Sequence, residues 1–407
     1  MIRILFNAIC LIGVLSACSQ SPSAQNVVNA TVEDVVTIVD YPTPGAHQFD
    51  SYLPSLDGKS VGLIVNKASQ INGTHLVDAL ISRGVAVKAI FAPEHGFRGN
   101  ADAGEKIDSD VDQKTGLPIY SLYGKNKKPS KAQFINLDVI VFDLQDVGVR
   151  FYTYLSTLHY VMEAAAESGI PVTLLDRPNP NGFYTAGPVL DSKYESFVGL
   201  HPVPIVTGMT IGEYAQMING EGWLANAAKC DLTIVKCPTY SHNQTFELPV
   251  APSPNLPNHR AVLLYPSLCL FEGTTVSVGR GTDYPFQQIG HPKLTQYDDS
   301  FVPKSGYGSK YPKHENKFCF GENLTQLSMD DIIDKQLDFS YLWELSASMK
   351  SVNATFFNDN NFFEKLAGTQ SIRNGINAGT DLDEVSASWA KELSIFMDVR
   401  SKYLLYD

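Results

Sequence analysis

The sequence predicts an α/β fold built on a parallel sheet, and three observations support this prediction. Between residues 61 and 175, short apolar runs of strand length alternate with stretches that have helical spacing. Several of these runs are continuously apolar, which is typical of strands buried on both faces. The chain has 407 residues, more than the roughly 250–300 at which one core stops growing. We therefore expect a second domain.

Each element of the sheet domain follows from its own pattern. Strands are predicted at four apolar runs: Val61–Val65, Val85–Phe91, Leu137–Phe142 and Pro171–Leu175. Helical spacing lies between them, over His75–Arg83 and from Tyr154 to Gly169. A helix at Thr210–Leu224 and a strand at Leu232–Val235 are expected to close this domain.

The pattern changes after a Pro-rich stretch, Ala251–Pro257. A loop-rich region, Phe271–Pro292, follows, and then helical patterns at Met329–Lys350 and Ser386–Tyr403. We predict a sheet domain over residues 46–260 and a smaller α+β domain over residues 261–407.

The first residues have the features of an export signal. Met1-Ile-Arg3 is a short basic start, and Ile4–Leu15 is mostly apolar. This run of about a dozen residues is too short to span a bilayer of roughly 30 Å as a helix. Leu15-Ser-Ala-Cys18 resembles a bacterial lipobox, so residues 1–17 are predicted to be a signal peptide and Cys18 the acylated residue. Residues 18–45 are then a tether, polar in its first part.

Composition and motifs exclude several classes of protein. The formal charge of −12 opposes nucleic-acid binding, which needs a basic face. No G-x-G-x-x-G opens a helix after a strand, and no phosphate-binding loop or G-x-S-x-G nucleophile elbow occurs. We therefore expect no nucleotide, no other cofactor and no metal, which leaves chemistry by carboxylates.

Polar residues gather where three predicted strands end. The segments are Glu94–Gly99, Asp143–Tyr154 and Asp176–Gly182. Ligands of open parallel sheets bind at the carboxyl ends of the strands, so three ends rich in carboxylate and arginine indicate a site.

These motifs resemble the exo-β-N-acetylmuramidase (NamZ) family. The matching segments are EHGFRG at 94–99, DLQDVGVRFYTY at 143–154 and DRPNP at 176–180. Further matches, in the same order, are MTIGE at 209–213, PSPNLP at 252–257, FEGT at 271–274, SVGRGT at 277–282 and YLLY at 403–406. The resemblance runs from about residue 50 to the end. It implies a Rossmann-like domain and a smaller second domain, with the active cleft between them. It also implies release of N-acetylmuramic acid from the non-reducing ends of peptidoglycan fragments.

The resemblance implies that Glu94 is the catalytic glutamate. Asp143 and Asp146, with Glu272 after them, are the candidates for a second carboxylate. Muramic acid carries a lactyl carboxylate, which an arginine can bind through two hydrogen bonds; the candidates are Arg98, Arg150, Arg177 and Arg280. Other residues of the motifs are expected to contact substrate: His95, Gln145, Tyr152, Asp176 and Asn179. Each of these also has a structural interpretation, as a helix cap, an internal ion pair or core packing.

Two other functions stay open at this point. A non-catalytic sugar-binding lipoprotein would keep the cleft but tolerate loss of Glu94. A metal-dependent hydrolase using Asp143 and Asp146 would lose activity in a chelator. We expect the protein to be exported and held in the periplasm at the outer membrane, with the bilayer bound through acylated Cys18 and a peptidoglycan-derived sugar as substrate.

Overall fold

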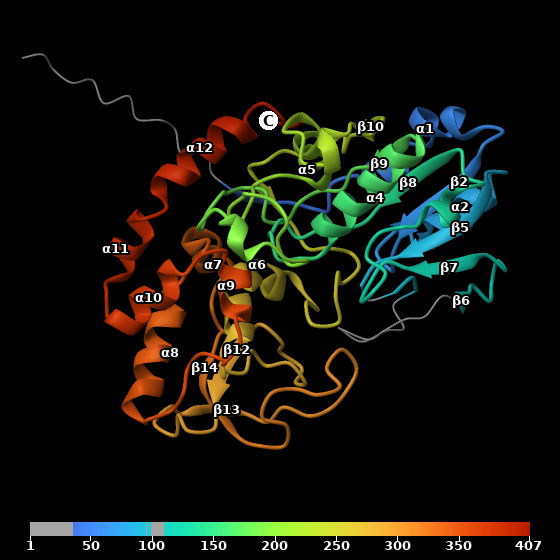
Figure 1. The fold of residues 1–407 in the computed structure, drawn as a ribbon. Helices are drawn as coiled ribbons and strands as arrows, with labels where there is room; N and C mark the ends of the chain where they lie inside the picture. The colour runs from blue at the N-terminus through green and yellow to red at the C-terminus, as the bar shows by residue number, and fades with distance from the viewer. Residues whose placement is uncertain (1–35, 95, 99–109) are drawn as a thin grey trace, which may run out of the picture. The chain divides into compact units, whose positions relative to one another are not determined.

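The predicted parallel sheet forms the centre of the N-terminal region. A computed structural model describes residues 36–94, 96–98 and 110–407, and within them this sheet has seven strands in the order β10-β9-β8-β2-β5-β7-β6 (Figure 1). The strands are β2 (Ser60–Val65), β5 (Ala86–Ala92), β6 (Asp110–Val111), β7 (Pro118–Ser121), β8 (Val139–Asp143), β9 (Val172–Leu175) and β10 (Leu232–Val235). All neighbours pair in parallel except β6 with β7.

The strand order places a crossover at the middle of the sheet. Strand β2 lies between β5, which follows it in the chain, and β8, which comes much later. Val61 pairs with Val87 on one side and with Val139 on the other. In a doubly wound sheet, the crevice where the strand order reverses is the usual place for ligands. The Rossmann-like prediction is confirmed.

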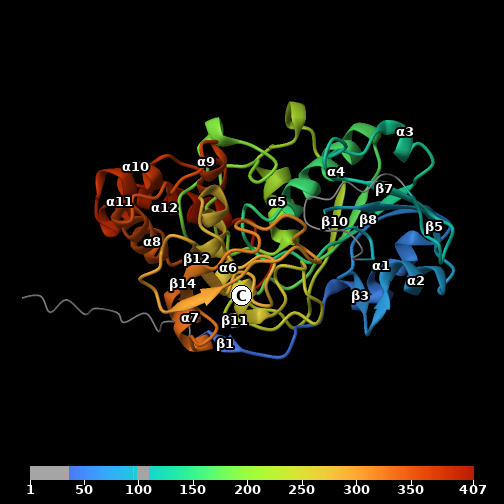
Figure 2. The same cartoon turned by 90° about the horizontal axis from the view of Figure 1, so that it is seen from below.

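Helices cover both faces of this sheet. Alternate residues of β2 point to opposite faces, so Ile64 packs with α4 (Tyr154–Ser168), whereas Leu63 packs with α1 (Phe49–Leu56) and α2 (Leu76–Ile81). Figure 2 shows the strands between α4 on one side and α1 and α2 on the other. Helix α4 ends at Gly169, whose φ of 65° is the left-handed conformation that glycine adopts at helix ends.

Smaller elements complete the N-terminal region. They are the parallel pair β1 (Thr37–Ile38) and β11 (Gln244–Thr245), the antiparallel pair β3 (Gln70–Ile71) and β4 (Thr74–His75), α3 (Lys131–Phe134), α5 (Ile211–Gly220) and the 3-10 helices η1 (Gly45–His47), η2 (Ser192–Tyr194) and η3 (Ala225–Ala227). Helix α5 begins with a capping box, in which Thr210 Oγ1 accepts from Glu213 N and the Glu213 side chain accepts from Thr210 N. It is shorter than the helix predicted over Thr210–Leu224.

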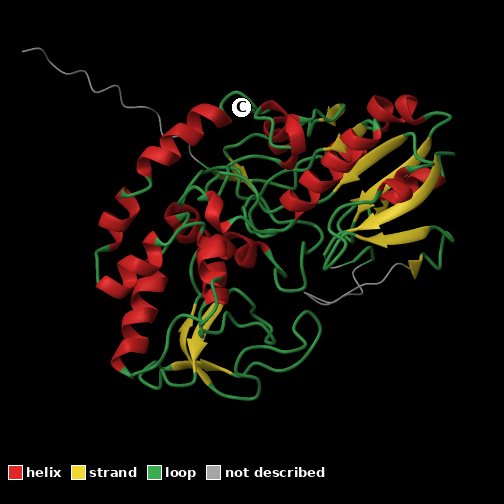
Figure 3. Cartoon of the chain, in the orientation of Figure 1, coloured by secondary structure: helices red, strands yellow, loops and turns green. Residues whose placement is uncertain are grey.

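The C-terminal region is a smaller α+β arrangement, as predicted. An antiparallel sheet of order β12-β14-β13 stands beside helices, and long loops run between this part and the large sheet (Figure 3). The elements are α6 (His259–Leu268), η4 (Cys269–Gly273), β12 (Gln288–His291), β13 (Asp299–Phe301), β14 (Cys319–Asn323), α7 (Met329–Lys335), α8 (Ser340–Ser351), α9 (Phe362–Ala367), α10 (Ser371–Ala378), α11 (Leu382–Ala387) and α12 (Ala390–Arg400).

Both long helical patterns of this region are divided in the structure. The first breaks after α7 at Gln336, whose φ of 55° ends the helix and lets Phe339 enter the core. The second breaks between α11 and α12, where Trp389 is buried. One hydrophobic core continues from the large sheet into these helices, from Phe142 to Leu342 and Phe363.

Among the described residues, no helix is long and apolar enough to cross a membrane. The four cysteines of this part of the chain, Cys230, Cys237, Cys269 and Cys319, are buried and free of disulfide bonds.

Candidate active site

A cavity of about 520 Å³ lies where the ends of the parallel strands meet the C-terminal region. Four of the predicted site residues line it: Glu94, Tyr152, Glu272 and Arg280. The first two come from before residue 260 and the last two from after it. The cavity thus joins segments that are far apart in the sequence.

Glu94 is held by hydroxyl groups at the end of β5. The strand ends at Ala92, and Pro93 leads into Glu94, which is half-buried. Thr153 Oγ1 donates to Glu94 Oε2 at 2.9 Å, and the Tyr123 hydroxyl also hydrogen-bonds to this side chain. Burial and the neighbouring Glu94 carboxylate hold the pKa of Tyr123 above its usual value, so Tyr123 stays a donor at neutral pH. The Tyr154 hydroxyl donates to the Glu94 backbone carbonyl at 3.4 Å.

Glu272 and Arg280 form an ion pair on the cavity wall. Arg280 Nε donates to Glu272 Oε1 at 2.6 Å. Burial disfavours the charge on Arg280, but the Glu272 carboxylate more than offsets this, so the pKa of Arg280 lies above its usual value. The Arg280 guanidinium also lies over the ring of Phe286, 5.1 Å from its centroid. Among the described residues Arg280 is hydrogen-bonded through Nε alone, which leaves both Nη groups for a ligand.

Aromatic rings form much of the apolar wall. Tyr152 packs edge to face against Tyr154, with 4.8 Å between the ring centroids, and its hydroxyl donates to the Pro252 carbonyl at 2.8 Å. Tyr265 packs against both Tyr152 and Phe286. Tyr154 lines a second hollow of about 210 Å³, which shares Ser253 with the first.

Asp143 lies outside the cavity, in a buried ion pair. It ends β8 with no exposed surface, and both of its carboxylate oxygens bind Arg177: Oδ1 accepts from Nε at 2.5 Å and Oδ2 from Nη2 at 2.9 Å. Tyr41 lies between this pair and Gln145, to which its hydroxyl donates at 2.8 Å. Asp143, Gln145 and Arg177 therefore support one another instead of facing the cavity.

Asp146 is also buried outside the cavity. Gly148 N donates to Asp146 Oδ2 at 2.6 Å, whereas Oδ1 has no hydrogen-bond partner among the described residues. Burial raises the pKa of Asp146 to about 7. The carboxyl group holds the turn that leads toward Arg150.

Arg150 links the strand-end loop to the C-terminal region. Its Nη1 donates to the carbonyls of Pro188 at 2.9 Å and Val203 at 2.7 Å, and its Nη2 donates to Leu366 at 2.9 Å, in the last turn of α9. These partners are backbone carbonyls, and burial lowers the pKa of Arg150 to about 9. Arg98 is likewise used elsewhere, in ion pairs with Asp78 and Asp112.

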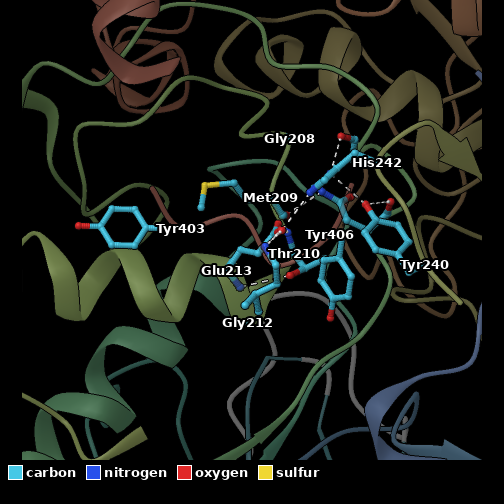
Figure 4. A network of polar contacts seen from close by, with 12 residues as sticks. Gly208, Met209, Thr210, Gly212, Glu213, Tyr240, His242, Tyr403 and Tyr406 are labelled. Carbon is cyan, nitrogen blue, oxygen red and sulfur yellow. Dashed lines mark hydrogen bonds and ion pairs between the residues drawn. The ribbon is translucent and has the colours of Figure 1, made fainter. Parts of the chain in front are cut away.

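Asp176 anchors the end of the chain. Its Oδ2 accepts from Thr210 Oγ1 at 2.7 Å and from the Tyr406 hydroxyl at 2.6 Å. Glu213 extends this network, because its Oε2 accepts from Thr210 N at 2.9 Å and its Oε1 lies 3.0 Å from His242 Nε2 (Figure 4). The same Oε1 accepts from Leu405 N at 2.7 Å. Burial raises the pKa of Asp176 to about 6.

Asn179 is buried in the same part of the fold, where its Nδ2 donates to the Met209 carbonyl at 2.8 Å. Two predicted residues, Cys18 and His95, lie outside the described residues.

Several cavity residues were missed by sequence reasoning. Tyr123 follows β7, a strand near the edge of the sheet that has no clear apolar run, and Thr153 stands inside a quoted motif without being singled out. Asn255 belongs to the PSPNLP motif. The signal that could have identified Thr153 is its place as a hydroxyl residue beside Tyr152, at the start of α4.

The chain matches two family models, which together cover most of its length. Residues 61–260 match the model described as exo-beta-N-acetylmuramidase NamZ, N-terminal, and residues 263–406 match its C-terminal counterpart. The chain is 39% identical to the peptidoglycan beta-N-acetylmuramidase NamZ of Bacillus subtilis (strain 168), over 97% of each chain.

Two solved structures are similar to this chain in sequence and in fold. A DUF1343 family protein from Bacteroides fragilis NCTC 9343 is 45% identical and superposes with a TM-score of 0.83, over 90% of this chain and 99% of that one. A second DUF1343 family protein from the same organism is 27% identical, with a TM-score of 0.77, over 91% of this chain and 100% of that one.

Proposed function

Because this chain belongs to the NamZ family of exo-β-N-acetylmuramidases, we propose that it is a glycosidase that releases N-acetylmuramic acid from the non-reducing ends of peptidoglycan fragments. The observation that supports this most strongly is the position of Glu94. Its carboxyl group faces a cavity lined by aromatic rings and an arginine, at the carboxyl end of a parallel strand.

Glu94 acts as the general acid that protonates the glycosidic oxygen. Thr153 and Tyr123 both contact its carboxyl group, which fixes the orientation of this group in the cavity. A positioned carboxylic acid of this kind typically accelerates the reaction by about 10²–10⁴-fold. The preceding residue, Pro93, limits the freedom of the backbone at this point.

Glu272 is the best-placed second carboxylate. It lines the same cavity as Glu94, whereas Asp143 and Asp146 are buried outside it. A second carboxylate can serve as base, as nucleophile or as the group that stabilises positive charge on the sugar. Its ion pair with Arg280 fixes the position of the carboxylate on the cavity wall.

Arg280 recognises the lactyl carboxylate that distinguishes muramic acid from glucosamine. The Nη groups of Arg280 have no partner among the described residues, and a guanidinium can bind a carboxylate through two parallel hydrogen bonds. This contact selects muramic acid by charge as well as by shape.

The decisive test compares two chromogenic substrates. The purified protein should cleave an aryl β-N-acetylmuraminide roughly ten- to a hundredfold faster than the matching glucosaminide, since the lactyl group adds one charge-assisted contact. A chelator should leave the rate unchanged, because the two cavity carboxylates do the chemistry. Equal rates on both substrates, or loss of activity in the chelator, would contradict the proposal.

We also propose that the protein is a periplasmic lipoprotein, anchored through Cys18 to the outer membrane. The support is the sequence Leu15-Ser-Ala-Cys18 after an apolar run. This location would place the cavity beside the cell wall.

A further inference from the structure

The segment 271–276 carries Glu272 to the cavity, and Lys313 is bound to its backbone. Lys313 Nζ lies within hydrogen-bond distance of four carbonyl oxygens of the segment: 2.9 Å from Phe271, 3.2 Å from Glu272, 2.6 Å from Thr274 and 3.3 Å from Val276. An ammonium group has three N–H donors, so the four carbonyls share them. The geometry is that of a small cation inside a ring of oxygens.

The remaining carbonyl oxygens of the segment are also bound from outside it. His314 Nε2 lies 2.7 Å from the Thr275 carbonyl, and Asn358 N donates to the Gly273 carbonyl at 3.1 Å. The Asn358 side chain adds a bond to the Glu272 carbonyl at 3.2 Å. Each carbonyl from 271 to 276 therefore has a partner from residue 313, 314 or 358. The backbone on both sides of Glu272 is fixed by these bonds.

In the described part of the chain, the ammonium group of Lys313 hydrogen-bonds to these carbonyl oxygens. Burial lowers the pKa of Lys313 to about 8, the Glu272 carboxylate acts in the opposite direction, and Arg280 adds to the lowering. Cys269 and His314 also interact electrostatically with this ammonium group. Lys313 is therefore a half-buried cation that contributes to the electrostatics of the Glu272–Arg280 pair without lining the cavity.

We infer that Lys313 is a positioning residue: its ammonium group holds the backbone of residues 271–276 so that Glu272 and Arg280 keep their orientation in the cavity. When the Lys313 side chain is removed, the ring of carbonyls becomes a site for a small alkylammonium ion, because carbonyl oxygens bind N–H donors and monovalent cations. This role rests on the proposed function, since the pair it positions binds and processes the muraminide.

The test is chemical rescue of Lys313→Ala. This variant lacks three carbons and the ammonium group, which propylammonium replaces. The variant should lose roughly ten- to a hundredfold in kcat/KM for an aryl muraminide, with KM raised because Arg280 is displaced. Propylammonium should restore kcat/KM in a saturable way. Tetramethylammonium, which has no N–H donor, should not.

Two controls separate positioning from general loss of structure. Lys317→Ala removes an exposed lysine from the same loop and should behave as the unaltered protein with and without propylammonium. Should Lys313→Ala not fold, Lys313→Met keeps most of the apolar stem. It should fold and show the same rise in KM.

A further readout does not depend on catalysis. Propylammonium should raise the melting temperature of Lys313→Ala and leave that of the unaltered protein unchanged. If the unaltered protein does not cleave muraminides, the proposed function fails, but this stabilisation still tests the carbonyl site. A folded Lys313→Ala with normal kcat/KM, or a loss that propylammonium does not reduce, would overturn the inference.

Discussion

Arg280 donates its Nε hydrogen to Oε1 of Glu272 at 2.6 Å, on the wall of the cavity that Glu94 also lines. The ion pair holds the guanidinium plane in place, while its Nη groups remain for a ligand. A preformed arginine of this kind loses little conformational freedom when a carboxylate binds.

Arg280→Lys keeps the positive charge but removes the planar guanidinium group and its paired N–H donors. We expect kcat/KM on the muraminide to fall roughly ten- to a hundredfold, mostly through KM, because one bidentate contact to the lactyl carboxylate is lost. The residual rate on the glucosaminide should hardly change. Steady-state kinetics on both substrates check this. An equal loss of kcat/KM on the two substrates would show that Arg280 does not bind the lactyl group.

Asp143→Asn should destabilise the protein rather than act on catalysis alone. Arg177 would be left as a buried charge without its carboxylate, a change that typically lowers the free energy of unfolding by about 3–5 kcal/mol. Urea denaturation of Asp143→Asn and of Asp143→Leu/Arg177→Met tests this, and the double variant should be the more stable of the two. An Asp143→Asn protein of normal stability and no activity would return Asp143 to the list of catalytic groups.

Asp146 should make stability depend on pH. Its pKa is raised to about 7 in the fold, against 3.8 in the unfolded chain, so between these values the folded state holds a proton that the unfolded state has lost. The contribution of protonated Asp146 to the free energy of unfolding is complete below about pH 4. It decreases as the pH rises through this window and is lost above about pH 7. The total change is at most about 4 kcal/mol.

Asp146→Asn should remove this contribution. Asp176 contributes in the same direction, since its pKa is raised to about 6, so the informative quantity is the difference between the unaltered protein and the variant. Free energies of unfolding measured from pH 4 to pH 8 provide it. A difference that stays constant over this range would show that Asp146 does not titrate there.

Cys18→Ala tests the anchor. The unaltered protein should sediment with membranes, and the variant should appear in the soluble fraction of the periplasm with unchanged kcat/KM. Immunoblots of the two fractions measure this. Membrane association of the variant would mean that Leu15-Ser-Ala-Cys18 is not a lipobox.

The sheet was predictable because its central strands are buried on both faces, so their sequences are continuous apolar runs. Val61–Val65 and Leu137–Phe142 overlap closely with β2 and β8. Strand β7 was missed because it lies near the edge of the sheet, and its sequence, PIYS, carries a proline and a serine. The breaks in the C-terminal helices depend on tertiary contacts, such as the burial of Phe339, that no local pattern contains.

The candidate site was predictable only in part. Motif residues identify which strand ends are polar, but not which polar groups bind one another. Asp143 and Arg177 carry the same types of group as Glu94 and Arg280, and the fold joins the first two to each other and turns the second two toward the cavity. Lys313 could not be recognised at all, because its partners are backbone carbonyls, which every residue has.

The most direct test of the central claim, that Glu94 is the general acid, is the leaving-group dependence of Glu94→Gln. Glutamine keeps the size of the side chain and its contact with Thr153 but has no proton to donate to the glycosidic oxygen. On a natural disaccharide, turnover should fall by about 10²–10⁴-fold, whereas an aryl muraminide with an acidic leaving group should be cleaved with a much smaller loss. Glu272→Gln, the matched control in the same cavity, should not show this dependence. A folded Glu94→Gln protein with near-normal turnover of the disaccharide, or with the same loss on both substrates, would contradict the assignment.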